Sequence, residues 1–291
     1  MQPVIKWSGS KRSQAHDIVK CIGNKIYEIY YEPFCGGCSV LAYIIANENI
    51  AKQFKSFVCS DLNEDLISSY NLIKTNPSYI IENYNVMWNE LNQESNSLED
   101  KKRYFEKIRT RLNIEHNPVD FIFIMRTTTN GMPRYNKNGE FNNSFHITRN
   151  GITPDKFEKI VTEWSRLLNQ YNVQFICQSF EKIVPNENDL VYLDPPYANT
   201  KGMYFGGFDN MCLFAFLERL RCDWMLSYDG MAGDDNLVVD VPKNLYKRHL
   251  LINSGNSSFR RVIGNDKYCN VQESLYLNFE PQCILEDQLL F

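Results

Sequence analysis

The chain has 291 residues, of which 43% are hydrophobic and 23% charged, and its formal net charge is -4. This length exceeds the usual size of one hydrophobic core, so we expect a core domain with an insertion or a second domain. The composition is ordinary for a globular protein and excludes extensive disorder. Its longest apolar stretches, such as Leu41 to Ala46, are far shorter than the ~20 residues of a bilayer span. We therefore expect no membrane segment and a cytoplasmic location, with no export signal.

Charge and cysteine usage do not announce a ligand. The nine cysteines are scattered, which favours reduced thiols over a disulfide framework. Cys35-Gly36-Gly37-Cys38 has the spacing of half a zinc site, but no second pair completes it, and we predict no metal. The acidic balance argues mildly against a nucleic-acid partner. A basic cluster from Lys101 to Arg111 runs the other way, and it fits either a phosphate-binding surface or a solvated helix face.

The first elements form an α/β unit. Ile29 to Phe34 predicts a buried strand, Cys35 to Gly37 a turn and Ser39 to Asn47 an apolar helix. A second strand, Phe57 to Ser60, ends at Asp61 and precedes a helix from Asn63 to Ile73. Asp61 therefore follows the glycines by about 25 residues, the spacing of an acidic group that binds ribose hydroxyls in a nucleoside-binding fold.

The α/β alternation then lapses between Lys74 and Trp164. This stretch contains a charged helical segment, strong turn signals at Asn130-Gly131 and Asn138-Gly139, and an apolar helix that starts at Pro154. Strands are predicted again at Val173 to Cys177, Leu190 to Leu193 and Trp224 to Ser227, with a helix from Met211 to Leu220. Two strand-helix units would separate the glycine turn from Asp194 by roughly 70 residues, and the gap is about 160. We predict a core of residues 1–73 and 165–291 and an inserted, mainly helical domain at 74–164, with a hairpin near 126–145.

The run Asp194-Pro195-Pro196-Tyr197 carries the chemistry. Asp194 follows a predicted strand, where open α/β sheets bind their ligands, and the prolines fix a rigid extended turn. The Asp194 carboxylate and the Pro195 carbonyl can accept the two N–H groups of an exocyclic amine, while Tyr197 stacks on its base. Two acceptors localise the delocalised lone pair of such an amine and aim it at a methyl group on a sulfonium. The rest of catalysis is mainly positioning.

With these residues in place, the chain resembles the Dam-type, D12 class of adenine-N6 DNA methyltransferases. The matching segments run in the order of that family and reach from the N-terminus to about residue 230. They are Lys6 to Lys11, Glu32 to Gly37, Asp61 to Asn63, Phe121 to Asn142 and Asp194 to Tyr197. The resemblance implies a Rossmann-like methyltransferase core that uses S-adenosylmethionine, and a restriction-modification enzyme or a relative of one from a bacterium or phage.

The resemblance also assigns ligands to positions of this chain. The cofactor would be bound by Trp7, Ser8, Gly9, Lys11, Phe34, Gly36, Asp61, Phe180 and Asp194. The inserted hairpin would contact duplex DNA, and the candidates there are Arg126, Asn130, Met132, Arg134 and Asn136. An adenine would rotate out of the duplex to reach Asp194. Ser227-Tyr228-Asp229 lies where the family has a strand near the target base, which fits either a site or simple packing.

The chain departs from the family pattern at three positions. Ser10 and Cys38 stand where glycine is usual, and their side chains narrow the room for close backbone approach. Ser179 stands where an aspartate often contacts the cofactor, so cofactor binding could be weakened. None of these changes removes the catalytic carboxylate.

Several alternatives stay open at this point. A related enzyme could methylate N4 of cytosine in DNA or N2 of guanine in RNA, and a protein with this fold could bind DNA without turnover. A nicotinamide oxidoreductase shares the glycine turn and acidic residue, although Glu32 to Gly37 lacks the full dinucleotide fingerprint. We expect a monomer, with double-stranded DNA and a cognate restriction endonuclease as candidate partners. The recognition sequence, the strand preference and the role of the last 60 residues are left open.

Overall fold

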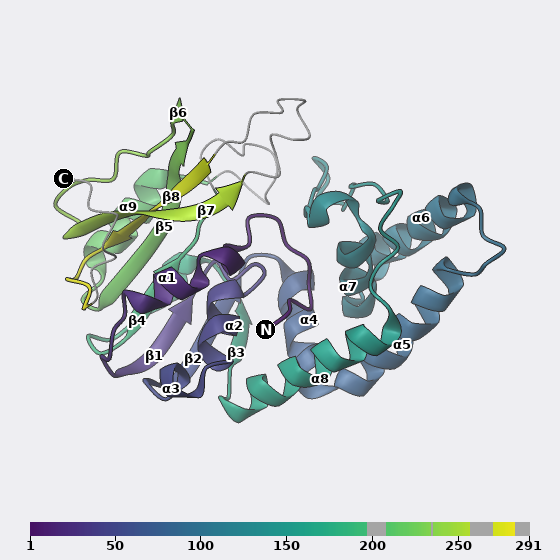
Figure 1. Cartoon of the computed structure of the whole chain (residues 1–291), viewed down its shortest axis with the longest axis horizontal. Coiled ribbons are helices and arrows are strands. Elements are labelled where there is room, and N and C mark those ends of the chain that lie inside the picture. The colour runs from purple at the N-terminus through teal and green to yellow at the C-terminus, as the bar shows by residue number, and fades with distance from the viewer. Residues whose placement is uncertain (197–207, 234, 257–269, 283–291) are drawn as a thin grey trace.

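A computed structural model of the chain describes residues 1–196, 208–233, 235–256 and 270–282 (Figure 1). An eight-stranded sheet forms its centre, in the order β3-β2-β1-β4-β5-β8-β7, with β6 paired to β5. The strands are β1 (Tyr27–Glu32), β2 (Phe54–Asp61), β3 (Gln174–Cys177), β4 (Leu190–Leu193), β5 (Asp223–Ala232), β6 (Asp235–Asn236), β7 (Arg248–Asn256) and β8 (Asn270–Leu277).

The strand order creates a switch point in the middle of the sheet. Strands β3, β2, β1, β4 and β5 are parallel, and β8 and β7 are antiparallel additions beyond β5. The chain moves outward from β1 through β2 to β3, and then returns to place β4 on the other side of β1. Open sheets of this kind bind ligands outside the carboxyl ends of the strands that flank such a reversal. The predicted α/β core is confirmed.

Helices surround the sheet and extend to one side of it. Those near the sheet are α1 (Ala15–Lys20), α2 (Ser39–Ile45), α3 (Glu48–Ala51), α4 (Glu64–Thr75) and α9 (Asn210–Arg219). The helical region at the right of Figure 1 contains α5 (Pro77–Leu91), α6 (Leu98–Glu115), α7 (Pro118–Thr127) and α8 (Pro154–Gln170). Local signals start these helices: proline opens α5, α7 and α8, and Ser97 with Asp100 forms a capping box on α6.

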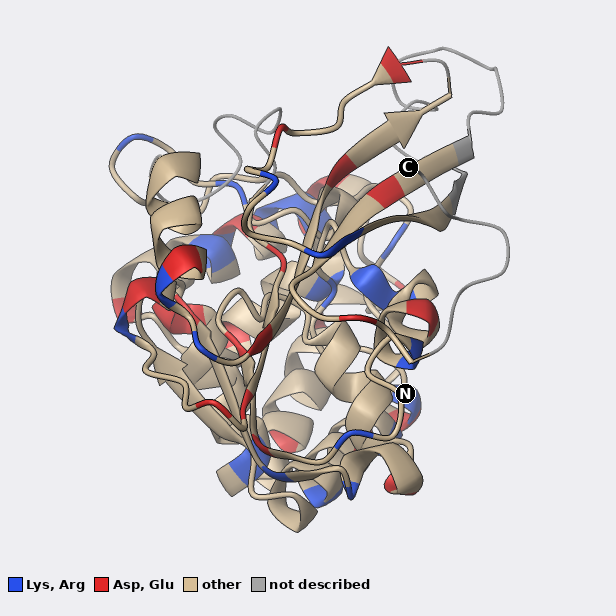
Figure 2. Ribbon diagram, turned by 90° about the vertical axis from the view of Figure 1, so that its left-hand side faces the viewer, with Lys and Arg blue, Asp and Glu red and all other residues tan. Residues whose placement is uncertain are grey.

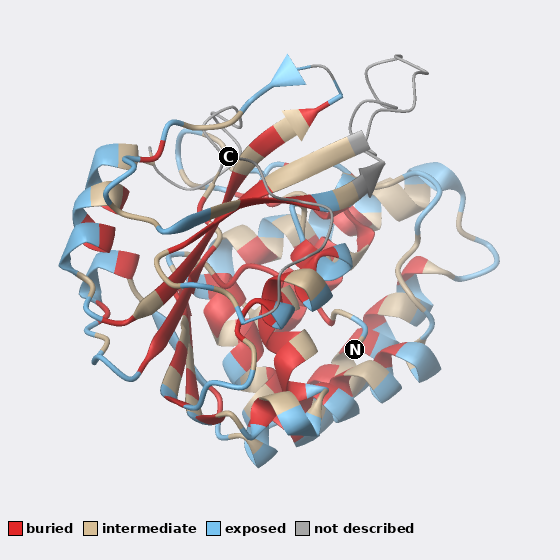
Figure 3. Ribbon diagram, turned by 60° about the vertical axis from the view of Figure 1, so that its left-hand side comes forward, coloured by how far each residue is buried: buried red, intermediate tan, exposed pale blue. Residues whose placement is uncertain are grey.

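The predicted domain boundaries at residues 74 and 164 both fall inside helices. Residue 74 lies in α4 and residue 164 in α8, and Trp164 packs beside Tyr70 of α4 with ring centroids 5.8 Å apart. One hydrophobic cluster runs from the sheet through α4 and α8 into α5 and α7. Figure 3 shows the buried positions continuing from the strands into these helices. The helical region is thus an extension of the core, because its apolar faces have no separate interior to fill.

The start of the chain is held between the core and the helical region (Figure 1). Trp164 donates from Nε1 to the carbonyl of Gln2 at 2.7 Å. Arg126, at the end of α7, donates from Nε to the carbonyl of Val4 at 2.6 Å, and its other guanidinium nitrogen donates to the carbonyl of Pro3. These contacts fix the N-terminal segment before it reaches the edge of the sheet.

The hairpin predicted near 126–145 is present in an irregular form. It consists of two isolated antiparallel bridges, Thr128 with Phe145 and Tyr135 with Phe141, rather than two full strands.

Figure 2 shows Lys and Arg distributed among Asp and Glu along the helical ribbons. Within the described residues, no helix is both long and apolar enough to span a bilayer.

Candidate active site

A cavity of ≈ 580 Å³ opens at the carboxyl edge of the sheet, around the switch point between β1 and β4. The segments that line it lie far apart in the sequence. They are the N-terminal loop, the turn after β1, the end of β2, the hairpin, the segment after β3 and the turn after β4. All the residues predicted to bind cofactor line this one cavity: Trp7, Ser8, Gly9, Lys11, Phe34, Gly36, Asp61, Phe180 and Asp194.

The floor is the glycine turn after β1. Gly36 has φ +42°, and a Cβ there would meet Nε1 of Trp7 at 2.8 Å. A Cβ at Gly37 would lie 3.0 Å from the Trp7 Cβ. The indole therefore packs directly on backbone, which a larger residue at 36 would not permit. Cys38, where the family commonly has glycine, adopts a left-handed conformation (φ 50°), which residues with a side chain rarely adopt.

Asp61 faces the cavity from the end of β2. Its Oδ2 accepts from the Gly36 N–H at 3.1 Å, and its Oδ1 accepts from the Asn63 N–H at 3.0 Å. Burial raises the pKa of Asp61 to about 6, against the opposing effect of these backbone hydrogen bonds. A carboxylate held in this way has lone pairs left to accept further hydrogen bonds from hydroxyl groups.

Aromatic rings form the side of the cavity next to β4. Phe34 and Phe180 lie with ring centroids 5.1 Å apart and planes tilted by 31°. Phe208 meets Phe34 edge-on at 5.8 Å. Flat apolar walls of this kind suit a planar heterocycle.

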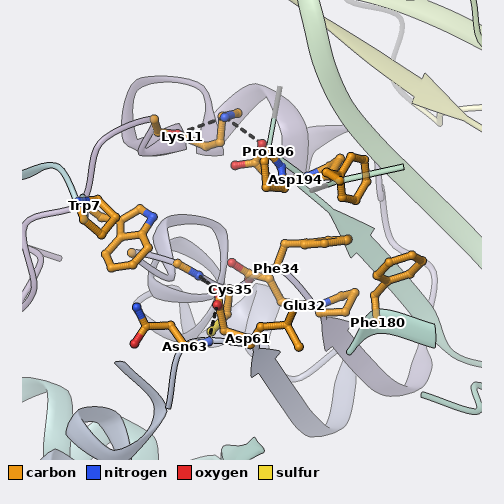
Figure 4. Close-up of a pocket in the computed structure, with 18 of the residues that line it drawn as sticks. Trp7, Lys11, Glu32, Phe34, Cys35, Asp61, Asn63, Phe180, Asp194 and Pro196 are labelled. Atoms are coloured by element: carbon orange, nitrogen blue, oxygen red, sulfur yellow. Dashed lines mark hydrogen bonds and ion pairs between the residues drawn. The ribbon is translucent and has the colours of Figure 1, made fainter. Parts of the chain in front are cut away.

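Asp194 lies at the mouth of the cavity and is paired with a buried lysine (Figure 4). Its Oδ1 is 2.8 Å from Nζ of Lys11, whose side chain is only 4% exposed. The same Nζ donates to the Gly9 carbonyl at 3.0 Å and lies 3.3 Å from Oε2 of Glu273 on β8. Burial opposes the charge of Lys11, but the Asp194 and Glu273 carboxylates outweigh it and raise the Lys11 pKa well above its usual range.

Asp229 of the Ser227-Tyr228-Asp229 segment lies close to this group. Burial, reinforced by the charge of Glu273 and opposed by that of Lys11, raises the pKa of Asp229 to about 6. Its Oδ2 is buried and has no hydrogen-bond partner among the described residues. By contrast, Ser227 is buried and shares a hydrogen bond of 2.8 Å with the Tyr192 hydroxyl, which is a packing contact.

The thiols behind the glycine turn belong to the interior. Cys35, Cys38 and Cys59 are buried as free thiols. Burial alone would raise the Cys38 pKa, but hydrogen bonds from Cys35, Cys59 and Tyr70 lower it to about 5. No group of three His, Cys, Asp or Glu side chains within the described ranges is arranged to hold a metal ion.

The predicted DNA contacts divide into three groups. Asn130 and Arg134 are exposed on the hairpin. Met132 lines the cavity instead of a groove-facing surface. Asn136 accepts from the N–H groups of Asn138 and Glu140 at 2.9 and 3.0 Å and so shapes the turn. Arg126 donates to the N-terminal carbonyls, so both Arg126 and Asn136 make hydrogen bonds within the chain in this structure.

The prolines and the tyrosine of the catalytic run have different outcomes. Pro195 and Pro196 line the cavity beside Asp194. Tyr197, predicted to stack on the base, lies outside the described residues.

Two contacts between the hairpin and the cofactor loops were not predicted. Asn63 donates from Nδ2 to the Tyr135 hydroxyl at 2.6 Å, and the Ser8 N–H donates to the Gly131 carbonyl at 3.0 Å. Tyr135 and Asn63 both line the cavity. Glu273 was also missed, because a single acid within the weakly patterned last 60 residues carries no signal of its own.

Comparisons with known proteins show which proteins the chain is similar to. The chain is 32% identical over 212 residues to the type II methyltransferase M.MjaIII of Methanocaldococcus jannaschii, covering 68% of this chain and 69% of that one. It is 27% identical to the DNA adenine methylase of Haemophilus influenzae, covering 97% and 90%. Among solved structures, the rRNA methyltransferase AviRa of Streptomyces viridochromogenes covers 91% of this chain and 82% of its own at 9% identity, with a TM-score of 0.39.

The family model with the description "D12 class N6 adenine-specific DNA methyltransferase" matches residues 7–247, the span that contains the N-terminal loop, the glycine turn, the hairpin and the Asp194 turn. The family and the methyltransferase activity predicted from the sequence are thereby confirmed. The chain belongs to the D12 class of N6 adenine-specific DNA methyltransferases.

Proposed function

We propose that the chain transfers a methyl group from S-adenosylmethionine to N6 of an adenine that has rotated out of duplex DNA, with Asp194 as the catalytic acceptor. The single observation that carries this proposal is the cavity at the switch point. Its rim carries Asp194, Pro195 and Pro196, and its walls hold the other side chains expected to bind the cofactor.

The residues present fit S-adenosylmethionine. The volume of ≈ 580 Å³ lies in the range of nucleoside-sized sites. Gly36 leaves the floor open where a Cβ would collide with Trp7. Asp61 offers carboxylate oxygens for ribose hydroxyls, and Phe34 with Phe180 offers flat walls for adenine. When bound, the cofactor supplies a methyl group on a positively charged sulfur.

The chain itself positions and polarises the amine. In this proposal the Asp194 carboxylate and the Pro195 carbonyl accept hydrogen bonds from the two N6 N–H groups, so that the nitrogen lone pair points at the methyl group. Lys11 anchors Oδ1 of Asp194 at 2.8 Å and so fixes the direction of the carboxylate. After transfer the nitrogen carries an extra proton, and the Asp194 carboxylate is placed to take it.

The hairpin supplies the DNA contacts in this proposal. Arg134 and Asn130 are exposed beside the cavity mouth, and Met132 and Pro133 line that mouth. Base rotation costs a few kcal/mol, which such contacts must offset. A 2-aminopurine at the target position should therefore brighten when the protein binds. Base rotation would be contradicted if the fluorescence stays unchanged in a duplex whose counterpart, with adenine at the target position, is methylated.

The test of the catalytic assignment compares Asp194→Asn with Asp240→Asn, an exposed aspartate outside the cavity. Transfer of labelled methyl groups to DNA should fall by at least about 100-fold in Asp194→Asn, because both the acceptor and its charge are weakened. It should be unchanged in Asp240→Asn. Equal incorporation by the two variants would refute the role of Asp194, and N4-methylcytosine in place of N6-methyladenine would refute the substrate.

We further propose a cytoplasmic monomer that acts with a restriction endonuclease of the same system. The relative M.MjaIII carries the name of a type II methyltransferase, which supports the second part. Light scattering of the purified protein tests the first part, and a dimeric mass would contradict it.

A further inference from the structure

Lys11 is a buried cation that two carboxylates share. Its Nζ lies 2.8 Å from Oδ1 of Asp194 and 3.3 Å from Oε2 of Glu273, and it donates to the Gly9 carbonyl at 3.0 Å. The ammonium has three protons to donate, and these oxygens can accept from it. Asp194 and Glu273 keep 19% and 20% of their side chains exposed, whereas Lys11 is only 4% exposed.

The charge balance of this group matters for transfer to an amine. A positive charge moves from sulfur to N6 as the methyl group passes, so the surroundings of N6 should be net negative. A Lys11–Asp194 pair alone has no net charge, and the ammonium draws electron density from the oxygen that should accept an N6 proton. The Glu273 carboxylate, 3.3 Å from Lys11, adds a negative charge to this group, as the nearby Asp229 carboxylate does, and in a buried site such charges act strongly.

We propose that Glu273 is a positioning residue for methyl transfer, which holds Lys11 through an ion pair and offsets its charge. This inference rests on the proposed role of Asp194 as the acceptor. Glu273 does not line the cavity and acts through Lys11. Its contribution therefore belongs to the chemical step and not to the binding of cofactor or DNA.

The fold brings Glu273 to this position by an unusually close strand approach. β8 pairs with β5, and the register shifts between Tyr228 and Met231. A Cβ on Gly230 would lie 2.2 Å from the Gln272 carbonyl oxygen and 2.9 Å from the Glu273 Cα. β8 can approach β5 at Glu273 only because residue 230 has no side chain. A larger residue at 230 would push Glu273 away from Lys11.

The experiment measures single-turnover methyl transfer and steady-state kinetics for Glu273→Gln. We expect kcat to fall about tenfold, with KM for cofactor and for DNA within about twofold of wild type. The matched control is Glu280→Gln, which removes an exposed carboxylate that is ion-paired with Arg248 at 2.6 Å beyond the end of β8. It should keep the wild-type kcat. Glu273→Asp should recover part of the lost rate, because it restores the charge.

A second measurement tests whether Glu273 acts through its ion pair with Lys11. Free energies of unfolding are compared for wild type, Lys11→Met, Glu273→Gln and the double variant, without cofactor. We expect a non-additive result, because the two residues form one ion pair. Gly230→Ala should lower kcat in the same way as Glu273→Gln, since it displaces the same carboxylate.

Three outcomes overturn the inference. They are a wild-type kcat in Glu273→Gln, equal rates for Glu273→Gln and Glu273→Asp, and additive effects in the unfolding cycle. Each leaves the proposed function intact so long as wild type methylates adenine and Asp194→Asn does not. Wild-type transfer by Asp194→Asn would instead remove the proposed role of Asp194 and, with it, the basis of the inference.

Discussion

At the scale of single residues, the cavity combines groups whose ionisation is set by burial. Asp61 and Asp229 both have pKa values raised to about 6, and the first cause in each case is the loss of water around the carboxylate. Their neighbours differ, however. Asp61 accepts two backbone hydrogen bonds inside the cavity, whereas Asp229 lies beside Lys11 and Glu273. We therefore expect the affinity for S-adenosylmethionine to depend on the ionisation of Asp61 and not on that of Asp229.

We predict that the affinity for S-adenosylmethionine falls as the pH drops below about 6. The ribose hydroxyls donate to the ionised carboxylate, and Asp61 is protonated in the free protein below its pKa of about 6. Above pH 7 the affinity should be constant, and below the pKa it should decrease by about tenfold per pH unit. Calorimetry between pH 5 and pH 8 measures this. Asp61→Asn should bind weakly at every pH, and Asp229→Asn should keep the wild-type pH dependence.

At the scale of elements, the hairpin and the cofactor loops are joined by hydrogen bonds. Asn63 at the start of α4 bonds to the Tyr135 hydroxyl, and the N-terminal loop bonds to Gly131. Gly131 has φ +62°, and a Cβ there would meet the Lys6 side chain at 2.6 Å. A movement of the hairpin toward DNA would therefore also displace the loops that enclose the cavity.

Removal of the link between α4 and the hairpin should weaken cofactor binding moderately. Tyr135→Phe deletes the hydroxyl that accepts from Asn63 at 2.6 Å. We expect a loss of about 0.5–1.5 kcal/mol, or roughly two- to tenfold in Kd for S-adenosylmethionine, by calorimetry. Tyr104→Phe, which removes a hydroxyl bonded to Glu90 away from the cavity, is the control. A Tyr135→Phe protein that binds as tightly as Tyr104→Phe would show that the link is not used.

Helix α8 is expected to be essential for stability. Phe157 is fully buried and stacks on Tyr84 of α5 with ring centroids 3.7 Å apart. Phe157→Ala should lower the free energy of unfolding by about 3–5 kcal/mol, because it leaves a cavity and removes the ring contact. Denaturant titration measures the change. Leu98→Ala, at a position 45% exposed, should cost less than about 1 kcal/mol.

The sequence predicted local elements well and long-range ones poorly. The strand, glycine turn and helix around Gly36 have strong local signals, and they are present in the expected order, with the strand (Tyr27–Glu32) two residues earlier and the helix (Ser39–Ile45) two residues shorter than predicted. The helices α5 and α7 and the hairpin of β7 and β8 were not delineated, because their positions depend on partners that lie far away in the chain. For the same reason the bonds from Arg126 to the carbonyls of Pro3 and Val4 were not foreseen, because these residues lie more than 120 positions apart in the chain.

At the scale of the whole molecule, the formal charge of -4 limits the electrostatic part of DNA binding. Several arginines near the hairpin are already engaged. Arg111 pairs with Asp120 through two nitrogens, and Arg109 donates to the Asn143 carbonyl at 3.1 Å. We therefore expect DNA recognition to use cations that remain exposed on the hairpin, such as Arg134.

We predict that Arg134→Ala weakens duplex binding and makes it less sensitive to salt. If Arg134 binds a phosphate, the slope of log K against log salt should decrease in magnitude by about one. Fluorescence anisotropy over a range of salt concentrations measures this. Arg103→Ala, which removes an exposed arginine paired with Asp100 on α6, is the control. Identical slopes for the two variants would exclude Arg134 as a phosphate contact.

The sharing of Lys11 by two carboxylates also has a consequence for folding during translation. Lys11 is synthesised before the two carboxylates that accompany its burial, because one follows β4 and the other belongs to β8. An unpaired ammonium is costly to bury, so this lysine should remain in water while the earlier strands assemble. The nascent chain would then acquire a closed catalytic centre only when β8 inserts beside β5. A nascent chain that lacks β8 would therefore not modify DNA.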